Sequence, residues 1–268
     1  MTTSPIRIAV HGAAGRMGQR VVALCIQDDQ VALAAALDNA THPKIGTDAG
    51  LLCGVGEAHV TIGDELPQYV DVVIDFSLPE AVDGILQKCV RDRTPLVVAT
   101  TGMTEDQKAT IATAAEEIPI VMAPSMSMAV NLVMKLVSDA AAALKNNAAG
   151  VDVEIIERHH RFKEDAPSGT ALHFGKLVAD QMGQTNHVHG RSGRPGQRPS
   201  DEIGYHALRT GDNVGEHTIV FGLMGETIDL SVKGHTRDSY AYGAITAAKF
   251  LHGKKSGLYG MADVLNLK

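Results

Sequence analysis

Short apolar runs alternate with segments of helical character through the first half of the chain, and this alternation constrains the fold most. The runs are Ile6–Val10, Val31–Leu37, Val70–Phe76, Leu96–Ala99 and Ile118–Met122. Arg16–Ile26 and Thr104–Glu117, which lie between runs, have helical character. Strands that alternate with helices predict parallel pairing through helical crossovers, and unbroken Val and Ile runs fit strands buried on both faces. We therefore predict an α/β fold with a doubly wound parallel sheet.

The pattern changes near residue 127, which suggests a second domain. Met128–Asn146 predicts one long helix, while Val151–Glu157 and Thr227–Lys233 alternate apolar with polar side chains. Such alternation is typical of a sheet with one dry face and one polar or functional face. Met224-Gly225-Glu226 predicts a hairpin turn before the second of these strands. The second region is therefore expected to form an α+β domain.

Two further segments of the second half have a distinct character. Gly183–Ser200 carries Gly, Pro, Arg and His without periodicity, which predicts a long loop, either disordered or a functional lid. Tyr240–Leu251 is helical again.

Composition argues against several classes of partner. Among 268 residues, Lys plus Arg number 24 and Asp plus Glu 31, so the formal net charge is -7. Non-specific binding to nucleic acid or to an anionic membrane needs a basic face, and base stacking needs aromatic side chains, which are 4% here with no Trp. Three scattered cysteines, Cys25, Cys53 and Cys89, argue against a disulfide framework and a thiolate zinc site.

Two segments bear on targeting and on membrane association. The first ten residues, MTTSPIRIAV, lack a long apolar signal core, so we expect a cytoplasmic protein. Ile118–Val137 is mostly apolar over a membrane-spanning length, but Pro119, Pro124, Asn131 and Lys135 interrupt it. A buried strand followed by a buried helix explains this stretch better, and no membrane association is expected.

A glycine-rich segment follows the first predicted strand and opens the first predicted helix. Gly12, Gly15 and Gly18 form a GxxGxxG variant of the GxGxxG dinucleotide fingerprint. Gly12 permits the tight turn, Gly15 lets the backbone approach a pyrophosphate at the helix N-terminus, and Gly18 allows close packing of the helix on the sheet. The alternative is a glycine-rich turn that binds no nucleotide.

An acidic residue supports the nucleotide interpretation. The fingerprint requires one about 20 residues after the glycines, where it binds the adenosine ribose hydroxyls, and Asp38 ends the second predicted strand. A carboxylate there disfavours a 2′-phosphate, the next residue Asn39 is neutral, and Arg16 is a candidate phosphate partner. We expect NADH to serve at least as well as NADPH. No GxxxxGK[ST] pattern occurs, so a P-loop NTPase is unsupported.

The densest chemistry lies between Glu154 and Ala171, where a predicted strand enters a cationic loop and then a helix. Ser168 is a plausible N-cap after Pro167, and the small residues Gly169 and Thr170 leave the first helical N–H groups open. A helix N-terminus beside His159, His160, Arg161 and Lys163 predicts a site for carboxylates or phosphates.

The same segment offers proton donors and acceptors. The ordinary pKa of His is about 6.5 and that of Lys about 10.4, and an anion-binding cluster shifts either. A metal site at the His159-His160 pair is the first alternative, but no third ligand has suitable spacing and the neighbours are cationic, so no metal is expected. A solvated basic loop is the second alternative.

This segment resembles the bacterial 4-hydroxy-tetrahydrodipicolinate reductase family. Its pattern E-[IV]-x-E-x-H-x3-K-x-D-x-P-S-G-T-A matches position by position from Glu154 to Ala171. Similar segments extend over nearly the whole chain, at GAAGRMG, Asp75–Glu80, Ala99–Gly102 and Gly211–Thr218. The resemblance implies NAD(P)H-dependent reduction of a cyclic dicarboxylate, made from aspartate semialdehyde and pyruvate, with loss of water. That step leads to diaminopimelate and lysine.

The resemblance also implies roles for individual residues. By this resemblance, His159 would be a catalytic proton donor or acceptor, and Lys163 would be the proton donor. The implied substrate binders are His160, Ser168, Gly169, Thr170 and Thr101. The implied cofactor residues are Gly12, Ala13, Ala14, Gly15, Arg16, Met17 and Asp38 at the adenosine diphosphate end, and Ala99, Thr100, Thr101, Ala123, Pro124, Ser125 and Met126 at the nicotinamide end.

The resemblance implies the domain layout and the assembly as well. Residues 1–127, rejoined by 240–268, would form a Rossmann-like dinucleotide-binding domain. Residues 128–239 would form an α+β domain with an open mixed sheet, used for substrate binding and for assembly into a homotetramer. Nucleotide and dicarboxylate would then bind different domains.

Three departures from the family pattern occur. Ala99 replaces the first glycine of GTTG, Ser125-Met126 replaces Asn-Phe, and Asn39 replaces an Arg that serves a 2′-phosphate. Together they favour tolerance of NADH. Two other functions stay open: another two-domain NAD(P) reductase such as an aspartate or homoserine dehydrogenase, against which His159–Ala171 argues, and a regulator that senses NADH without turnover, against which Lys163 and His159 argue.

Overall fold

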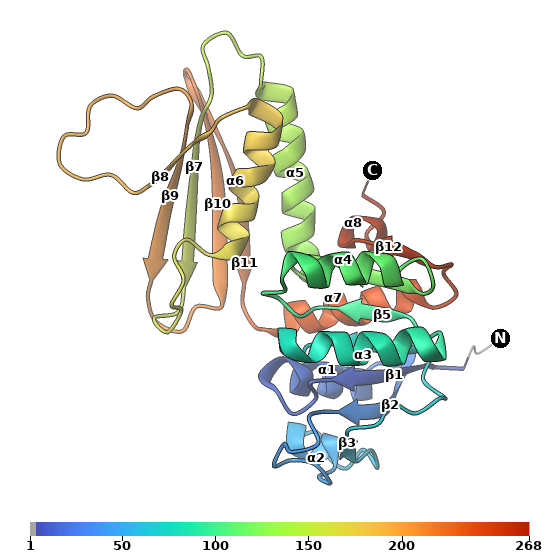
Figure 1. Cartoon of the computed structure of the whole chain (residues 1–268). Helices are drawn as coiled ribbons and strands as arrows, with labels where there is room; N and C mark the ends of the chain where they lie inside the picture. The colour runs from blue at the N-terminus through green and yellow to red at the C-terminus, as the bar shows by residue number, and fades with distance from the viewer. Residues whose placement is uncertain (1–3, 268) are drawn as a thin grey trace. The chain divides into compact units, whose positions relative to one another are not determined.

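The computed structural model describes residues 4–267, which divide into two compact units. The first unit comprises the chain up to Met128 and from Arg237 onward, and the second comprises Ala129–Thr236. The predicted division lay after residue 127, with the return at 240. Figure 1 labels most of the helices and strands of both units.

The first unit contains a seven-stranded sheet in which every neighbouring pair is parallel, in the order β12-β6-β5-β4-β1-β2-β3. Its strands are β1 (Ile6–His11), β2 (Val31–Leu37), β3 (Ile62–Gly63), β4 (Val72–Asp75), β5 (Leu96–Val98), β6 (Pro119–Met122) and β12 (Gly257–Tyr259). Strand order reverses beside β1, so the crevice at the carboxyl ends of β1 and β4 is where such sheets bind ligands.

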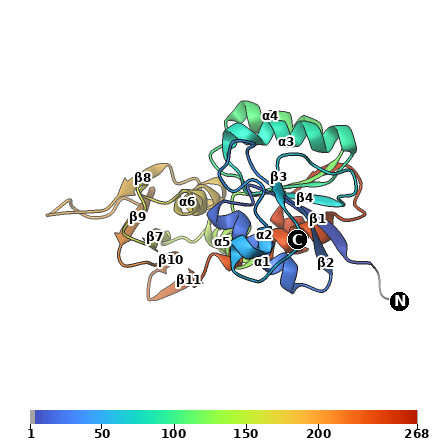
Figure 2. The same ribbon diagram turned by 90° about the horizontal axis from the view of Figure 1, so that it is seen from below.

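Helices cover both faces of this sheet. They are α1 (Arg16–Gln27), α2 (Ala49–Cys53), α3 (Pro79–Asp92), α4 (Glu105–Ala114), α7 (Asp238–Leu251) and α8 (Met261–Val264). One apolar core joins the sheet to α1 and α7, and a second joins it to α3 and α4. Figure 2 shows α3 and α4 together on one side of the sheet. The predicted Rossmann-like, doubly wound α/β architecture is confirmed.

The second unit is a five-stranded mixed sheet, in the order β11-β10-β7-β9-β8, with helices on one face. Its elements are α5 (Met128–Leu144), β7 (Asp152–His159), α6 (Gly169–Met182), β8 (Asn186–His189), β9 (Glu202–Arg209), β10 (Gly215–Leu223) and β11 (Glu226–Gly234). The core consists of apolar side chains from α5, α6 and the inner face of the sheet. In β7, Val153 and Ile155 are buried whereas Asp152 is exposed, as the alternation predicts.

The prediction of one loop over Gly183–Ser200 is wrong in part, because β8 lies within it and pairs parallel with β9. Its four side chains, Asn-His-Val-His, are largely exposed and show no apolar period, so backbone pairing rather than burial forms the strand. The rings of His187 and His189 stack on Tyr205 of β9. The remainder of the loop is tied to β7, where Arg198 Nη1 donates to Asp152 Oδ1 over 2.7 Å.

Candidate active site

The glycine-rich loop joins β1 to α1 and leaves no room for side chains at two positions. Gly12 has φ +77°, and a Cβ there would lie 2.7 Å from the Phe76 carbonyl oxygen. A Cβ on Gly18 would lie 2.0 Å from the Gly12 carbonyl oxygen. The missing side chain at Gly18 therefore lets the start of α1 lie directly against the loop that follows β1. Gly15 is the N-cap of α1, and its side-chain-free backbone leaves the helix N-terminus open.

Asp38 lies directly after β2 and contacts the glycine-rich loop. Its Oδ2 accepts a 2.9 Å hydrogen bond from the Ala14 N–H, and its Oδ1 accepts one from the Asn39 N–H. Arg16 and Asn39 are both exposed beside it. The predicted adenosine-end residues are thus adjacent in the first unit, and they fit a dinucleotide: a sterically closed glycine turn, an open helix N-terminus and a carboxylate at the neighbouring strand end.

Asp75, at the carboxyl end of β4, organises the next part of this edge and is fully buried. Its Oδ1 pairs with His11 Nδ1 at 2.7 Å and accepts from the Ser77 N–H at 3.2 Å. The Thr100 hydroxyl donates to Asp75 Oδ2 at 2.7 Å. One carboxylate therefore joins the ends of β1, β4 and β5.

The two predicted nicotinamide segments follow β5 and β6 at the same edge. Ala99 and Thr100 are buried, whereas Thr101 is exposed. In the second segment, Ser125 and Met126 are buried, Ala123 is partly buried and Pro124 is exposed. The Met126 carbonyl lies so close to Gly243 of α7 that a Cβ there would be 1.7 Å from its oxygen. The predicted cofactor residues therefore share one edge of the sheet, although Met126 faces the core.

In the second unit, four polar side chains lie at one end of the buried face of the sheet. Glu157 and His159 end β7, on the same face as Val153 and Ile155. Strand register places His217 of β10 opposite Glu157, and Arg209 of β9 opposite His159.

Glu157 is 1% exposed and accepts four hydrogen bonds. Arg209 binds it through both terminal nitrogens, Nη1 to Oε2 at 2.8 Å and Nη2 to Oε1 at 2.7 Å. His159 Nδ1 lies 2.6 Å from Oε2, and the Ser168 N–H donates to Oε1 at 3.1 Å. A single buried carboxylate thus contacts the predicted acid/base histidine and the start of the predicted anion-binding helix.

Ser168 is the N-cap of α6, as predicted. Its Oγ accepts from the Ala171 N–H at 3.2 Å and pairs with His217 Nε2 at 3.0 Å. The next two residues, Gly169 and Thr170, form the first turn, with Gly169 exposed. Because the first N–H groups of a helix have no acceptor within it, this end of α6 offers donors and a positive dipole to an anion.

The cationic loop between β7 and α6 holds the remaining predicted residues. Lys163 is partly exposed and pairs with Asp165, with 2.7 Å between Nζ and Oδ1. The His160 N–H donates to the Asn213 carbonyl at 2.7 Å, which ties this loop to the turn before β10. Within residues 4–267, the buried Nδ1 of His160 has no hydrogen-bond partner.

Burial and charge set the protonation of this group. Burial lowers the pKa of His159, and the Glu157 carboxylate partly opposes that shift. Burial also lowers the pKa of His217 to about 4, so that ring is neutral at neutral pH. For Glu157, burial raises the pKa, but the Arg209 and His159 hydrogen bonds outweigh it and hold the pKa below its usual range.

Glu157, Arg209 and His217 received no role from the sequence. Glu157 had a usable signal, since its place in the alternation of β7 puts a carboxylate on the dry face two residues before His159. Arg209 and His217 had none, because only the pairing of β9 and β10 with β7 brings them to Glu157.

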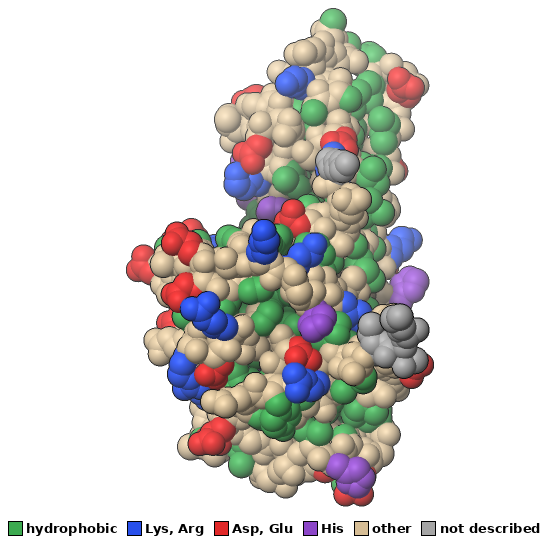
Figure 3. Space-filling view, turned by 90° about the vertical axis from the view of Figure 1, so that its right-hand side faces the viewer, with side chains coloured by type: hydrophobic (Ala, Val, Ile, Leu, Met, Phe, Trp, Pro, Cys, Tyr) green, Lys and Arg blue, Asp and Glu red, His purple; other side chains and the backbone are tan. Residues whose placement is uncertain are grey.

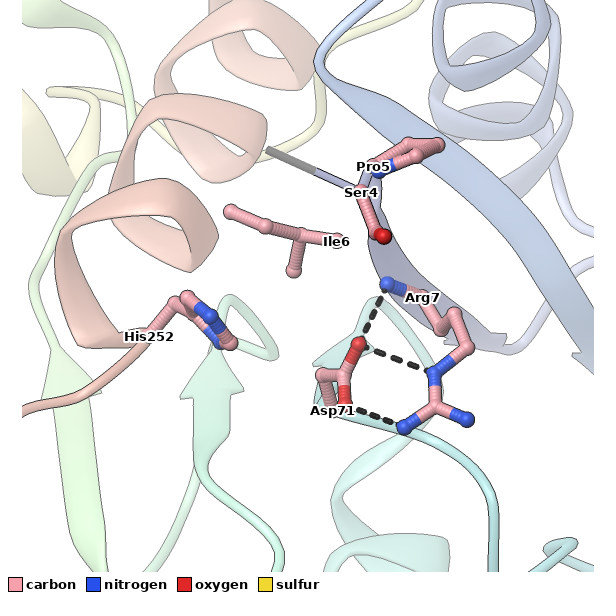
Figure 4. Close-up of a pocket in the computed structure, with 6 residues that line it drawn as sticks. All are labelled: Ser4, Pro5, Ile6, Arg7, Asp71 and His252. Atoms are coloured by element: carbon pink, nitrogen blue, oxygen red, sulfur yellow. Dashed lines mark hydrogen bonds and ion pairs between the residues drawn. The ribbon is translucent and has the colours of Figure 1, made fainter. Parts of the chain in front are cut away.

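Other features of the described residues bear on alternative functions. Residues 4–267 contain no group of three His, Cys, Asp or Glu side chains arranged to hold a metal, and none of their helices is long and apolar enough to cross a membrane. On the face in Figure 3, Lys and Arg side chains are interspersed with Asp and Glu. The pocket in Figure 4 lies at the amino end of β1, beside the Arg7–Asp71 pair, and therefore at the opposite end of that strand from the glycine-rich loop.

Comparison with known proteins agrees with the geometry of both units. Two family models match, described as the N-terminus of dihydrodipicolinate reductase over residues 6–126 and its C-terminus over residues 129–265. A 4-hydroxy-tetrahydrodipicolinate reductase from Rhodopirellula baltica is 55% identical, over 99% of this chain and 98% of that protein. One of the same name from Alkalilimnicola ehrlichii is 46% identical over the full length of both.

Solved structures share the fold of this chain. A dipicolinate-bound dihydrodipicolinate reductase from Paenisporosarcina sp. TG-14 superposes with a TM-score of 0.77 at 26% identity, over 97% of this chain and 99% of that one. A probable dehydrogenase from Thermotoga maritima, 12% identical with a TM-score of 0.63, shares the fold over 97% of this chain and 92% of its own. On the two matching models and these full-length relatives, the chain belongs to the dihydrodipicolinate reductase family, and the family predicted from its sequence is confirmed.

Proposed function

We propose that this reductase converts 4-hydroxy-tetrahydrodipicolinate to tetrahydrodipicolinate with NAD(P)H and loss of water, on the route to diaminopimelate and lysine. The observation that carries the proposal is the buried cluster at the end of β7. It places His159 against the Glu157 carboxylate and fixes the start of α6 through Ser168. The names of the full-length relatives support the substrate.

The second unit is proposed to bind the dicarboxylate. The open N-terminus of α6 at Gly169 and Thr170 supplies N–H donors for one carboxylate, with Ser168 alongside, and His160 lies in the adjoining cationic loop. The related structure that holds dipicolinate, a planar dicarboxylate, supports this ligand class. From the first unit, the exposed Thr101 is proposed to contact substrate as well as cofactor.

The first unit is proposed to bind the coenzyme along the edge described above. Gly12–Met17 and Asp38 would hold the adenosine diphosphate end, and Ala99–Thr101 with Ala123–Met126 the nicotinamide end. The bound nicotinamide supplies the hydride. Lys163 or His159 supplies the proton that balances it, because His159 ends β7 and Lys163 lies in the loop that leads from β7 to the anion-binding turn of α6.

Coenzyme preference is proposed to follow from Asp38 and Asn39. A carboxylate suits free ribose hydroxyls, and an exposed neutral Asn39 offers no charge to a 2′-phosphate. We expect kcat/KM for NADH to equal or exceed that for NADPH. Asn39→Arg should raise the NADPH to NADH ratio about tenfold, which corresponds to one added charge contact of about 1.4 kcal/mol. A wild-type enzyme with a large NADPH preference would contradict the assignment.

We further propose a cytoplasmic homotetramer assembled through the second unit. The face of its sheet opposite α5 and α6 carries the exposed side chains Ile156 and Leu208, 39% and 40% exposed. Sedimentation velocity should give the molecular mass of four chains. A monomer at micromolar concentration would contradict the proposal.

The decisive assay compares NADH oxidation with two substrates. Oxidation should require the freshly formed condensation product of aspartate semialdehyde and pyruvate, and the product should have lost water. Oxidation with aspartate semialdehyde alone would indicate a different dehydrogenase. Binding of NADH without any oxidation would indicate a sensor.

A further inference from the structure

We infer that Glu157 is the positioning residue that selects the tautomer of His159, holding the proton on Nδ1 and leaving Nε2 to exchange protons with the substrate. This inference rests on the proposed function, because the substrate is what Nε2 would serve. It assigns a role to a side chain that has none from the sequence.

The carboxylate can only accept hydrogen bonds. Arg209 contacts both oxygens, at 2.8 and 2.7 Å, and the Ser168 N–H takes a further position on Oε1. A bidentate guanidinium stabilises the ionised form. An ionised carboxylate has no proton to give, so His159 Nδ1, 2.6 Å from Oε2, must be the donor.

The ring then presents its other nitrogen. With Nδ1 protonated, neutral His159 carries a lone pair on Nε2, and protonated His159 carries its exchangeable proton there. Nε2 lies against the backbone of Gly215, where a Cβ would be only 2.9 Å away. Gly215 therefore leaves the space that lets the ring sit in this orientation.

Charged and titratable groups surround the ring from several elements. Glu157 lies on its own strand, Arg209 at the end of β9, Lys163 in the following loop, and His217 of β10 meets the ring edge-on at 5.2 Å between centroids. Burial, Lys163 and Arg209 lower the pKa of His159, whereas Glu157 raises it. Removal of the carboxylate should therefore lower this pKa further.

The first test requires no turnover. In protein with ¹⁵N-labelled histidine, long-range ¹H–¹⁵N correlation reports which ring nitrogen carries the proton, and His159→Gln identifies the signal. We expect the Nδ1–H form above the pKa of His159. The Nε2–H form in the wild-type protein would overturn the inference, whatever the outcome of the substrate assay, so failure of the inference and failure of the proposed function are distinguishable.

The second test is Glu157→Gln, which keeps the shape but removes the charge. We expect kcat to fall roughly 10²–10⁴-fold, as for other carboxylates that orient a catalytic histidine, and the pH limb of His159 to move down by about one unit or more. KM for the dicarboxylate should change much less. A variant that loses thermal stability but keeps kcat and the wild-type pH limb would assign Glu157 a structural role only and overturn the inference.

Glu154→Gln is the matched control. Glu154 lies on the same strand and also pairs with arginine and histidine, Arg191, Arg198 and His206, but on the opposite face. Burial raises its pKa, yet Arg191 and His206 outweigh burial and lower that pKa to about 2. We expect kcat within about twofold of wild type and an unmoved His159 limb, because the ion pairs of Glu154 are with Arg191, Arg198 and His206 and not with His159. Equal losses of kcat in both variants would contradict the specific role of Glu157.

Discussion

Each unit contains one buried carboxylate that collects donors from several elements, and the two differ in what they hold. Asp75 of the first unit joins His11, the Ser77 N–H and Thr100, and so ties together three loops at the carboxyl edge of the parallel sheet. Glu157 of the second unit joins His159, the Ser168 N–H and Arg209. Asp75 thus fixes the backbone at the edge where a coenzyme would lie, while Glu157 is inferred to set the protonation state of His159.

The largest predicted effect tests whether the chemistry belongs to the second unit. Lys163→Ala should lower kcat roughly 10²–10⁴-fold because this variant removes the proposed general acid. Stopped-flow measurement of NADH oxidation would check this. Lys176→Ala is the control, since Lys176 also pairs with an aspartate, Asp180, but on the exposed surface of α6. An unchanged kcat with only a raised KM would assign Lys163 to binding.

The second prediction concerns the loss of stability in acid that the buried His217 causes. His217 is 5% exposed and its folded-state pKa, about 4, is below the ordinary 6.5. The stability that depends on a neutral His217 is therefore fully present above pH 6.5. It is lost as the pH falls from 6.5 towards 4, because in this range the histidine binds a proton in the unfolded chain but not in the folded protein. The loss should be about 3 kcal/mol of unfolding free energy, measured by urea denaturation across this range.

His217→Gln keeps a partner for Ser168 and should flatten this pH dependence. The exposed His235 provides the control, and His235→Gln should leave the curve unchanged. An equally steep decline in His217→Gln would show that another group is responsible.

The third prediction addresses Asp75. Asp75→Asn should raise the Kd for NADH about tenfold and lower the unfolding free energy by about 1–3 kcal/mol, because it disturbs a fully buried hydrogen-bond acceptor. The pH limb assigned to His159 should not move. Asp71→Asn, at the amino end of the same sheet, removes the charge that pairs with the half-exposed Arg7 and should cost about 0–1 kcal/mol. Wild-type affinity for NADH in Asp75→Asn would contradict the role of Asp75 at the coenzyme edge.

The smallest predicted effect belongs to Gly84, which lies away from the coenzyme edge. Gly84, in the middle of α3, has open space at its Cβ position, so Gly84→Ala should stabilise the protein by about 0.4–1 kcal/mol. Gly18→Ala should destabilise it and weaken NADH binding, because its Cβ meets backbone at 2.0 Å. Thermal melting and NADH titration would check both.

Local patterns predicted much of the fold, and the failures have a common cause. The Ser168 cap, the alternation of β7 and the hairpin at Met224-Gly225 all depend on neighbours in sequence, and the structure contains each of them. The strand β8 and the contacts of Arg209 depend instead on pairing with strands that are distant in sequence. Such register is set by the whole sheet, which one sequence pattern does not encode.

The same distinction applies to the candidate site. His159 and Lys163 stand in a recognisable segment, but the residues that surround His159 come from β9 and β10. Gly18 shows the reverse case, because its spacing alone predicted a close approach of backbone, and its neighbour, the Gly12 carbonyl, lies in the same loop.

The comparison of the two carboxylates rests most directly on one paired measurement. NADH affinity by calorimetry and kcat by steady-state assay should be determined for Glu157→Gln and Asp75→Asn in parallel. We predict that Glu157→Gln binds NADH as wild type does but turns over slowly, and that Asp75→Asn binds NADH weakly while its kcat at saturating NADH stays within about tenfold of wild type. The opposite assignment of the two defects, or the same defect in both variants, would contradict it.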